Sequence, residues 1–125
     1  MEYQQFIDHV ADNGAFGTKA EAEQATLAVL DILGQRLTAG ESTDLAAQLP
    51  TELKAPLDRY NDEAEAFDVD DFLRRLADQL GRGIGPEEAR PQASAVLNTL
   101  AQAVSPGELD NLRSQLPAGF GALIG

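Results

Sequence analysis

The sequence is poor in several residue types that carry reactive chemistry. Its 125 residues include no cysteine and a single histidine. The absence of cysteine excludes disulfides, thiolate metal sites and cysteine nucleophiles.

Basic residues are also scarce. Nine lysines and arginines stand against 21 aspartates and glutamates, which gives a formal net charge of −12, and no basic run is longer than Arg74–Arg75. Nucleic acids and anionic membranes require a positively charged surface, so we expect the protein to bind neither. The acid surplus fits either ordinary solubility or adaptation to high salt.

Long apolar runs are missing as well. No stretch approaches the roughly 18 apolar residues of a membrane span, and the opening residues MEYQQFIDHVADNG carry acids where a secretory signal needs bases. We therefore expect a cytoplasmic protein. A chain of this length suits one domain, residues 1–125, and buries roughly 65–70% of its unfolded surface.

The chain contains an internal duplication. Residues 28–50 align with residues 95–117 at a constant offset of 67, without a gap and with eleven identities. We expect repeat one at about 1–57, an acidic junction at about 58–67 and repeat two at about 68–125. The identical pairs are Ala28/Ala95, Val29/Val96, Leu30/Leu97, Leu33/Leu100, Gln35/Gln102, Gly40/Gly107, Glu41/Glu108, Leu45/Leu112, Gln48/Gln115, Leu49/Leu116 and Pro50/Pro117.

Apolar residues recur at helical spacing in both repeats. The first stripe comprises Tyr3, Phe6, Ile7, Val10 and Ala11, and a similar stripe begins at Val69. No segment alternates with the period of two that is typical of strands. The sequence therefore predicts an all-α fold: two tandem homologous helical repeats packed as one bundle about a pseudo-two-fold axis.

Three helix starts carry the capping-box pattern, in which a hydroxyl and a glutamate three residues later each bind a free amide. These pairs are Thr18 with Glu21, Thr38 with Glu41, and Ser105 with Glu108. Pro86 suits the first turn of a helix. Pro91 lacks the amide that a helix interior needs, and it predicts a kink or a late helix start.

Two corners have the same sequence, Gln48-Leu49-Pro50 and Gln115-Leu116-Pro117. A glutamine beside a helix-ending proline can bind the free carbonyls of its own helix, while the leucine packs inside. We interpret both corners as structural. If a binding groove exists, we expect it where the two corners approach each other.

These features together resemble a known family. An aromatic-led first helix, EAEQATLAVLDILGQRL, a capped turn and AAQLP are followed by FLRRLADQLG, EEARPQASAVLNTL and RSQLP in the same order. The pattern is similar to the domain of unknown function 2267 family, small duplicated helical proteins of bacteria and archaea. The resemblance implies a fold and a duplication, and it implies no activity.

No motif predicts a catalytic, cofactor or metal site. His9 lies off the apolar stripe and is interpreted as a surface residue. The glycines of GRGIGP lack the preceding strand and following lysine of a phosphate loop. The acid-rich junction lacks the order of a calcium loop, and we assign its carboxylates to helix capping and solvation. Its acids are Asp62, Glu63, Glu65, Asp68, Asp70 and Asp71.

The function that we expect is a non-enzymatic module that binds another protein, with a basic partner or a second copy of itself as candidates. An alternative is a small-ligand binder or enzyme with a pocket between the repeats, lined by Phe6, Phe72 and the two corners. A stress or salt-tolerance protein is a third alternative. An exposed apolar patch over a filled core would favour the interaction module.

Overall fold

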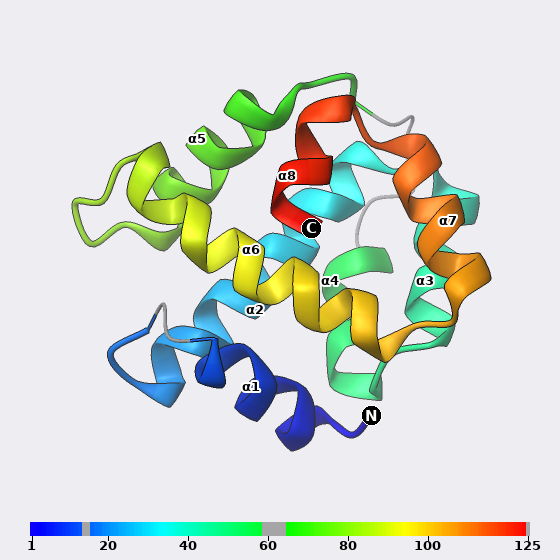
Figure 1. The fold of residues 1–125 in the computed structure, drawn as a ribbon, viewed down its shortest axis with the longest axis horizontal. Helices are drawn as coiled ribbons and strands as arrows, with labels where there is room; N and C mark the ends of the chain where they lie inside the picture. Colours follow the sequence, from blue (N-terminus) through cyan, green and yellow to red (C-terminus); the bar gives the residue numbers. More distant parts are fainter. Residues whose placement is uncertain (14–15, 59–64, 125) are drawn as a thin grey trace.

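The fold, obtained as a computed structural model, is built from helices (Figure 1). The structure describes residues 1–13, 16–58 and 65–124, and within these ranges no residue lies in a strand. The prediction of an all-α protein is confirmed for this part of the chain. The elements are α1 (Tyr3–Asp12), α2 (Lys19–Arg36), α3 (Ala39–Ala47), η1 (Thr51–Leu53), α4 (Lys54–Asp58), α5 (Val69–Leu80), α6 (Pro86–Ala103), α7 (Pro106–Gln115), η2 (Ala118–Phe120) and α8 (Gly121–Ile124).

Local side-chain chemistry sets where several helices begin. The Thr18 hydroxyl accepts a hydrogen bond from the Glu21 amide at 3.2 Å, and the Asp68 carboxylate accepts one from the Asp71 amide at 2.9 Å. Both bonds satisfy an amide that has no partner inside its helix. Pro86 is the first residue of α6, where a missing amide proton costs nothing.

The two long helices, α2 and α6, contact each other in the middle of the fold, and α1 and α5 each pack against both of them. The short helices α4 and α8 cover α2 and α6, respectively. Helices α3 and α7 lie side by side at one edge of the molecule (Figure 1).

Aromatic rings from three different elements contribute to the core. Phe6, Phe72 and Phe120 have essentially no exposed surface, and the rings of Phe72 and Phe120 meet edge to face with centroids 5.0 Å apart. The core of α2 also holds Thr26, whose hydroxyl donates to the Ala22 carbonyl at 2.8 Å. Leu27 lies outside this core with 37% of its surface exposed.

Pro91 does not delay the start of its helix, and the late start that it predicts is wrong. Helix α6 runs without a break from Pro86 to Ala103 and contains Pro91 in its second turn. The carbonyl that loses its usual donor belongs to Glu87, which is exposed, so water can bind it. The proline is tolerated because the affected bond lies close to the helix end, at an exposed residue.

The loop between α5 and α6 has three consecutive residues with positive φ, at Gly81, Arg82 and Gly83. Arg82 is the non-glycine residue among them, with φ of 51°, a conformation that disfavours a side chain. Its guanidinium is held by Glu21 at 3.3 Å and by Gln92 at 3.1 Å. These contacts tie the loop to α2 and α6.

The N-terminal helix is anchored to α2 through a tyrosine. The Tyr3 hydroxyl donates a hydrogen bond to the carboxylate of Glu23. Burial of the ring, followed by this bond to an anion, raises the pKa of Tyr3 to about 12.

No helix within the described ranges is both long enough and apolar enough to cross a membrane.

Gly34 and Gly107 provide a matched test of helix packing. An alanine Cβ at position 34 would lie 2.9 Å from the Leu57 carbonyl oxygen, whereas nothing lies within 4 Å of a Cβ at position 107. We expect Gly34→Ala to lower the free energy of unfolding by about 1–3 kcal/mol through overpacking.

We expect Gly107→Ala to raise it by about 0.5 kcal/mol, because alanine favours a helix over glycine. Urea titration of both variants measures these changes. A Gly34→Ala protein at least as stable as wild type would contradict the close approach of α2 and α4.

Candidate functional site

Helices α3 and α7 are joined by hydrogen bonds that cross between their ends. Gln48, at the end of α3, accepts a bond from the Ser105 amide at 2.7 Å and donates one to the Ser105 hydroxyl at 3.2 Å. Gln115, at the end of α7, accepts bonds from the amide and the hydroxyl of Thr38 at 3.2 and 3.3 Å. Each glutamine therefore binds the capping residue of the other helix, and the two helices run antiparallel.

This arrangement corrects the sequence-based interpretation of the corners, which paired Gln48 and Gln115 with the carbonyls of their own helices. The amide of the neighbouring cap lies within reach of each side chain and needs an acceptor, whereas helix-end carbonyls can bind water. The leucines of the corners differ in burial: Leu49 is buried and Leu116 is half-buried. Pro50 and Pro117 each precede a short 3₁₀ turn.

The capping boxes of α3 and α7 form only one of their two expected hydrogen bonds. The Thr38 hydroxyl accepts from the Glu41 amide at 3.3 Å, and the Ser105 hydroxyl accepts from the Glu108 amide at 3.2 Å. The carboxylates of Glu41 and Glu108 do not return these bonds, because the cap amides are already bound by the glutamines. In the first box, Glu21 accepts from the Gly17 amide at 2.9 Å in place of the Thr18 amide.

Glu41 and Glu108 instead place their carboxyl groups in the contact between α3 and α7. The two residues are only 6% and 7% exposed, and the Glu108 carboxyl lies close enough to Glu41 to act on it by hydrogen bonding and by charge. Among the described residues, no donor reaches the Oε1 atom of either side chain. Two ionised carboxylates would therefore face each other as acceptors, whereas one proton turns one of them into a donor.

The surroundings of Glu41 favour this proton. Burial, followed by the hydrogen bond to Glu108 and the charges of Glu108 and Asp44, raises the pKa of Glu41 to about 8. Both glutamates lie in the first turn of a helix, where the helix dipole favours the ionised form by about 0.3–1 kcal/mol. Burial and the neighbouring anions outweigh that effect.

A comparison of energies indicates that protonation of the pair is important for the contact between α3 and α7. Two unit charges about 4 Å apart repel by about 4 kcal/mol at an effective dielectric constant of about 20. The four hydrogen bonds between the helix ends each contribute about 0.5–1.5 kcal/mol. Repulsion within a doubly ionised pair is therefore as large as the sum of the polar bonds that hold the helices together.

Sequence reasoning missed this pair because a capping box already explained both glutamates. A second signal was available in the spacing. Glu41 precedes the buried Leu45 by four residues, and Glu108 precedes the buried Leu112 by four, so each glutamate shares a helix face with a core leucine.

The other candidate residues are not brought together. His9 is exposed on α1. In the acidic junction, Asp71 pairs with Arg74, and Glu65 pairs with Arg75 at 3.0 Å. Asp62 and Glu63 lie outside the described residues. No group of three or more potential metal-ligating side chains is found in the part of the chain that the structure describes.

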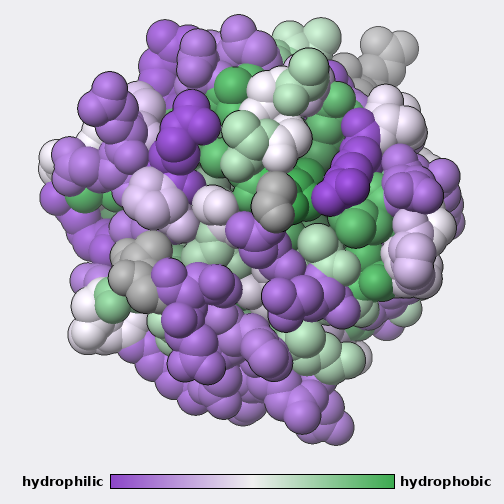
Figure 2. All heavy atoms as spheres, viewed as in Figure 1, coloured by the Kyte–Doolittle hydropathy of each residue, from purple (hydrophilic) through white to green (hydrophobic). Residues whose placement is uncertain are grey.

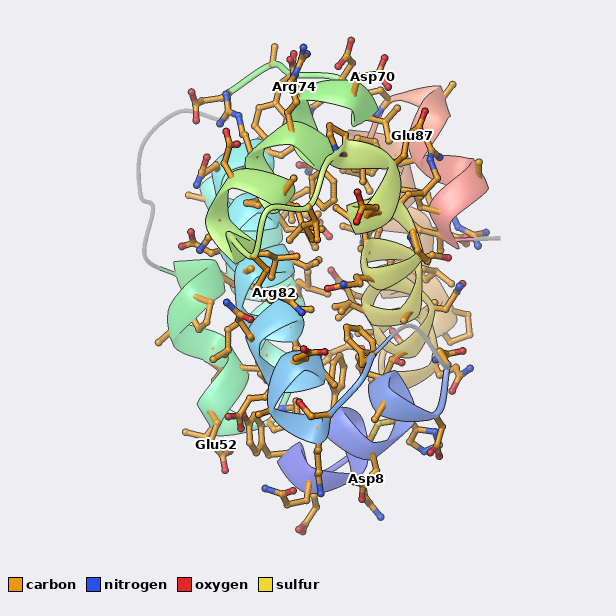
Figure 3. All side chains as sticks on the ribbon, turned by 90° about the vertical axis from the view of Figure 1, so that its left-hand side faces the viewer. Asp8, Glu52, Asp70, Arg74, Arg82 and Glu87 are labelled. Atoms are coloured by element: carbon orange, nitrogen blue, oxygen red, sulfur yellow. The ribbon has the colours of Figure 1, made fainter. Side chains whose placement is uncertain are left out.

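Phe6 and Phe72, which the alternative function places at a pocket between the repeats, are both fully buried in the core. The hollows described on the molecule are surface grooves. One of about 540 Å³ is lined by Asp70, Arg74, Gly85, Pro86, Glu87 and Glu88. Figure 3 shows Asp70, Arg74 and Glu87 at one end of the molecule, with Glu52 and Asp8 at the other.

A second groove lies between the end of α7 and α8. It has a volume of about 140 Å³ and is lined mainly by apolar residues, with Arg113 as the charged one. Its apolar lining comprises Leu116, Pro117, Ala118, Phe120 and Ile124 together with Gly121. Neither groove gathers a nucleophile with a neighbouring base.

Comparison with known proteins identifies a family over nearly the whole chain. The family model described as "Uncharacterized conserved protein (DUF2267)" matches residues 3–123. No curated protein matches the chain.

The crossed glutamine bonds can be tested by truncation. We expect Gln48→Ala and Gln115→Ala each to lower the free energy of unfolding by about 1 kcal/mol, because each loses two hydrogen bonds between α3 and α7. The control is Gln102→Ala on the exposed face of α6. Urea unfolding curves that superimpose for Gln48→Ala and Gln102→Ala would show that these bonds do not stabilise the fold.

The carboxyl pair gives the stability a defined pH dependence. Because the pKa of Glu41 is raised in the folded protein, its stabilising contribution is complete below about pH 4.5 and is lost as the pH rises to about 8. Within this window the free energy of unfolding should fall by on the order of 1 kcal/mol per pH unit relative to Glu41→Gln.

The amide of Glu41→Gln supplies a permanent donor to Glu108, so this variant has no proton to lose. Chemical unfolding at pH 5, 6, 7 and 8 measures the difference, with the exposed Glu87→Gln as the matched control. Equal pH profiles for wild type and Glu41→Gln would contradict the shared proton.

Proposed function

The chain belongs to the DUF2267 family, and we propose that it acts as a non-enzymatic module that binds a basic protein partner. The observation that carries this proposal is the uncompensated negative charge of the surface. The formal net charge is −12, and several of the few bases are engaged within the chain.

Because these bases are bound within the chain, many of the described acidic side chains form no ion pair. Lys19 binds Asp8 at 2.7 Å, and Arg36 donates to the Phe67 carbonyl at 3.1 Å. Within the described ranges no cation pairs with a further set of exposed acids, and this set supports recognition of a positively charged surface. Its members are Asp12, Asp44, Glu52, Asp70, Asp78, Glu87, Glu88 and Asp110.

Apolar surface also supports an interaction module. Figure 2 shows apolar residues gathered on the face over α8 and between α8 and α7, where the groove of about 140 Å³ lies. A contact that combines an apolar centre with charged surroundings has the usual anatomy of a protein interface. The full burial of Phe6 and Phe72 supports this reading over an enzyme with a central pocket.

The proposal includes the architecture inferred from the sequence: two tandem repeats in one domain, related by a pseudo-two-fold axis. The aligned pairs support it. Gln48 binds Ser105 as Gln115 binds Thr38, and the aligned glutamates Glu41 and Glu108 are both buried, one on each of the two contacting helices α3 and α7. Such reciprocal contacts are what a two-fold relation between copies requires.

The experiment is affinity capture from the lysate of the native host in 0.1 M salt, followed by a wash in 1 M salt and mass spectrometry. The screening length falls from about 10 Å to about 3 Å between these conditions, so a partner held by charge should be released. An unrelated acidic protein of equal size and net charge is the control. Capture of the same proteins by both baits would contradict a specific partner.

Charge-neutralising variants then locate the surface with the purified partner. Asp70→Asn/Glu87→Gln changes one end of the molecule, and Asp12→Asn/Glu52→Gln makes the same change in net charge elsewhere. We expect one variant to weaken binding by about two- to fivefold relative to the other in calorimetry. Equal affinities for wild type and both variants would remove these acids from the interface.

A further inference from the structure

The contact between α3 and α7 contains an arrangement that the proposed function does not use. At its two ends Gln48 is hydrogen-bonded to Ser105 and Gln115 to Thr38. Leu45 and Leu112 are buried in its middle. Between these lie Glu41 and Glu108, each more than nine-tenths buried, with one carboxyl oxygen apiece that no described donor reaches.

We propose that this contact is a pH-sensitive switch, in which one proton shared by Glu41 and Glu108 holds α3 against α7 and loss of that proton separates the two helices. The proton forms the hydrogen bond between the two carboxyl groups. When it leaves to solvent, two anions remain in a buried contact with no donor between them.

The neighbouring charges give the ionised pair no compensation. Helix α3 packs against α4 and α7. On α3 the nearby charge is Asp44, which is also an anion and acts on Glu41. On α4 the described cation is Lys54, and on α7 the charged residues are Asp110 and Arg113; none of these forms an ion pair with either glutamate.

The opening should be confined to this edge of the molecule. Helix α7 packs chiefly on α3, whereas α2 and α6 pack on several other helices. Helices α3 and α7 are also short, with 9 and 10 residues, and each is followed by a proline that ends its hydrogen-bond ladder. Separation would expose Leu45 and Leu112 to solvent and leave the central helices in place.

Hydrogen exchange with mass spectrometry at pH 5.5 and pH 8.5 tests the switch, after correction for the intrinsic exchange rate. We expect the protection of residues 39–47 and 106–115 to fall at least tenfold at the higher pH in wild type. Peptides from α2 and α6 should keep their protection, because a local opening leaves these helices folded.

Two variants control the experiment. Glu41→Gln retains a donor for Glu108 without a titratable proton, and it should keep α3 and α7 protected at pH 8.5; Glu108→Gln provides the same test from the other helix. Equal protection of α3 and α7 at both pH values in wild type would overturn the proposal. So would a loss of protection spread evenly over α2 and α6, or an equal loss in both glutamine variants.

The outcome is independent of the proposed function. A protein that binds no basic partner can still show the switch, and a module that binds such a partner can lack it. The exchange experiment needs no partner and therefore separates the two proposals.

Discussion

Two carboxyl groups that must share a proton constrain the edge of this protein where α3 meets α7. Glu41 and Glu108 are almost fully buried, face each other and lack a cation among the described residues. A buried anion beside another anion is stable only if one of them is neutralised. The contact between α3 and α7 therefore depends on a proton that is absent from the free side chains at neutral pH.

The position of the two glutamates follows from the hydrogen bonds made by the amides at the starts of α3 and α7. The amides of Thr38 and Ser105 are bound by glutamines of the opposite helices, so neither amide is available to its own glutamate. The two glutamates are thereby free to meet in the contact between the helices. Elsewhere the fold depends on packing of aromatic rings in the core and on the close approach of Gly34 to Leu57.

Features that depend on near neighbours in the sequence were largely predictable. The hydroxyls of Thr18, Thr38 and Ser105 bind the amides three residues later, and Pro86 begins its helix. The late helix start predicted at Pro91 was wrong, because the one lost hydrogen bond lies near the helix end at an exposed residue, and the sequence does not show that exposure. The pairing of Glu41 with Glu108 joins residues 67 positions apart, so a local capping pattern was the simpler explanation of each glutamate.

The protonation of the pair can be measured directly by following the side-chain carboxyl carbons of Glu41 and Glu108 in NMR spectra of the folded protein between pH 3 and pH 9. The account predicts that one of the two resonances titrates near pH 8, and that this step disappears in Glu41→Gln. If both carboxyl carbons titrate below pH 5, as free glutamates do, the buried pair is doubly ionised at neutral pH and the account is wrong.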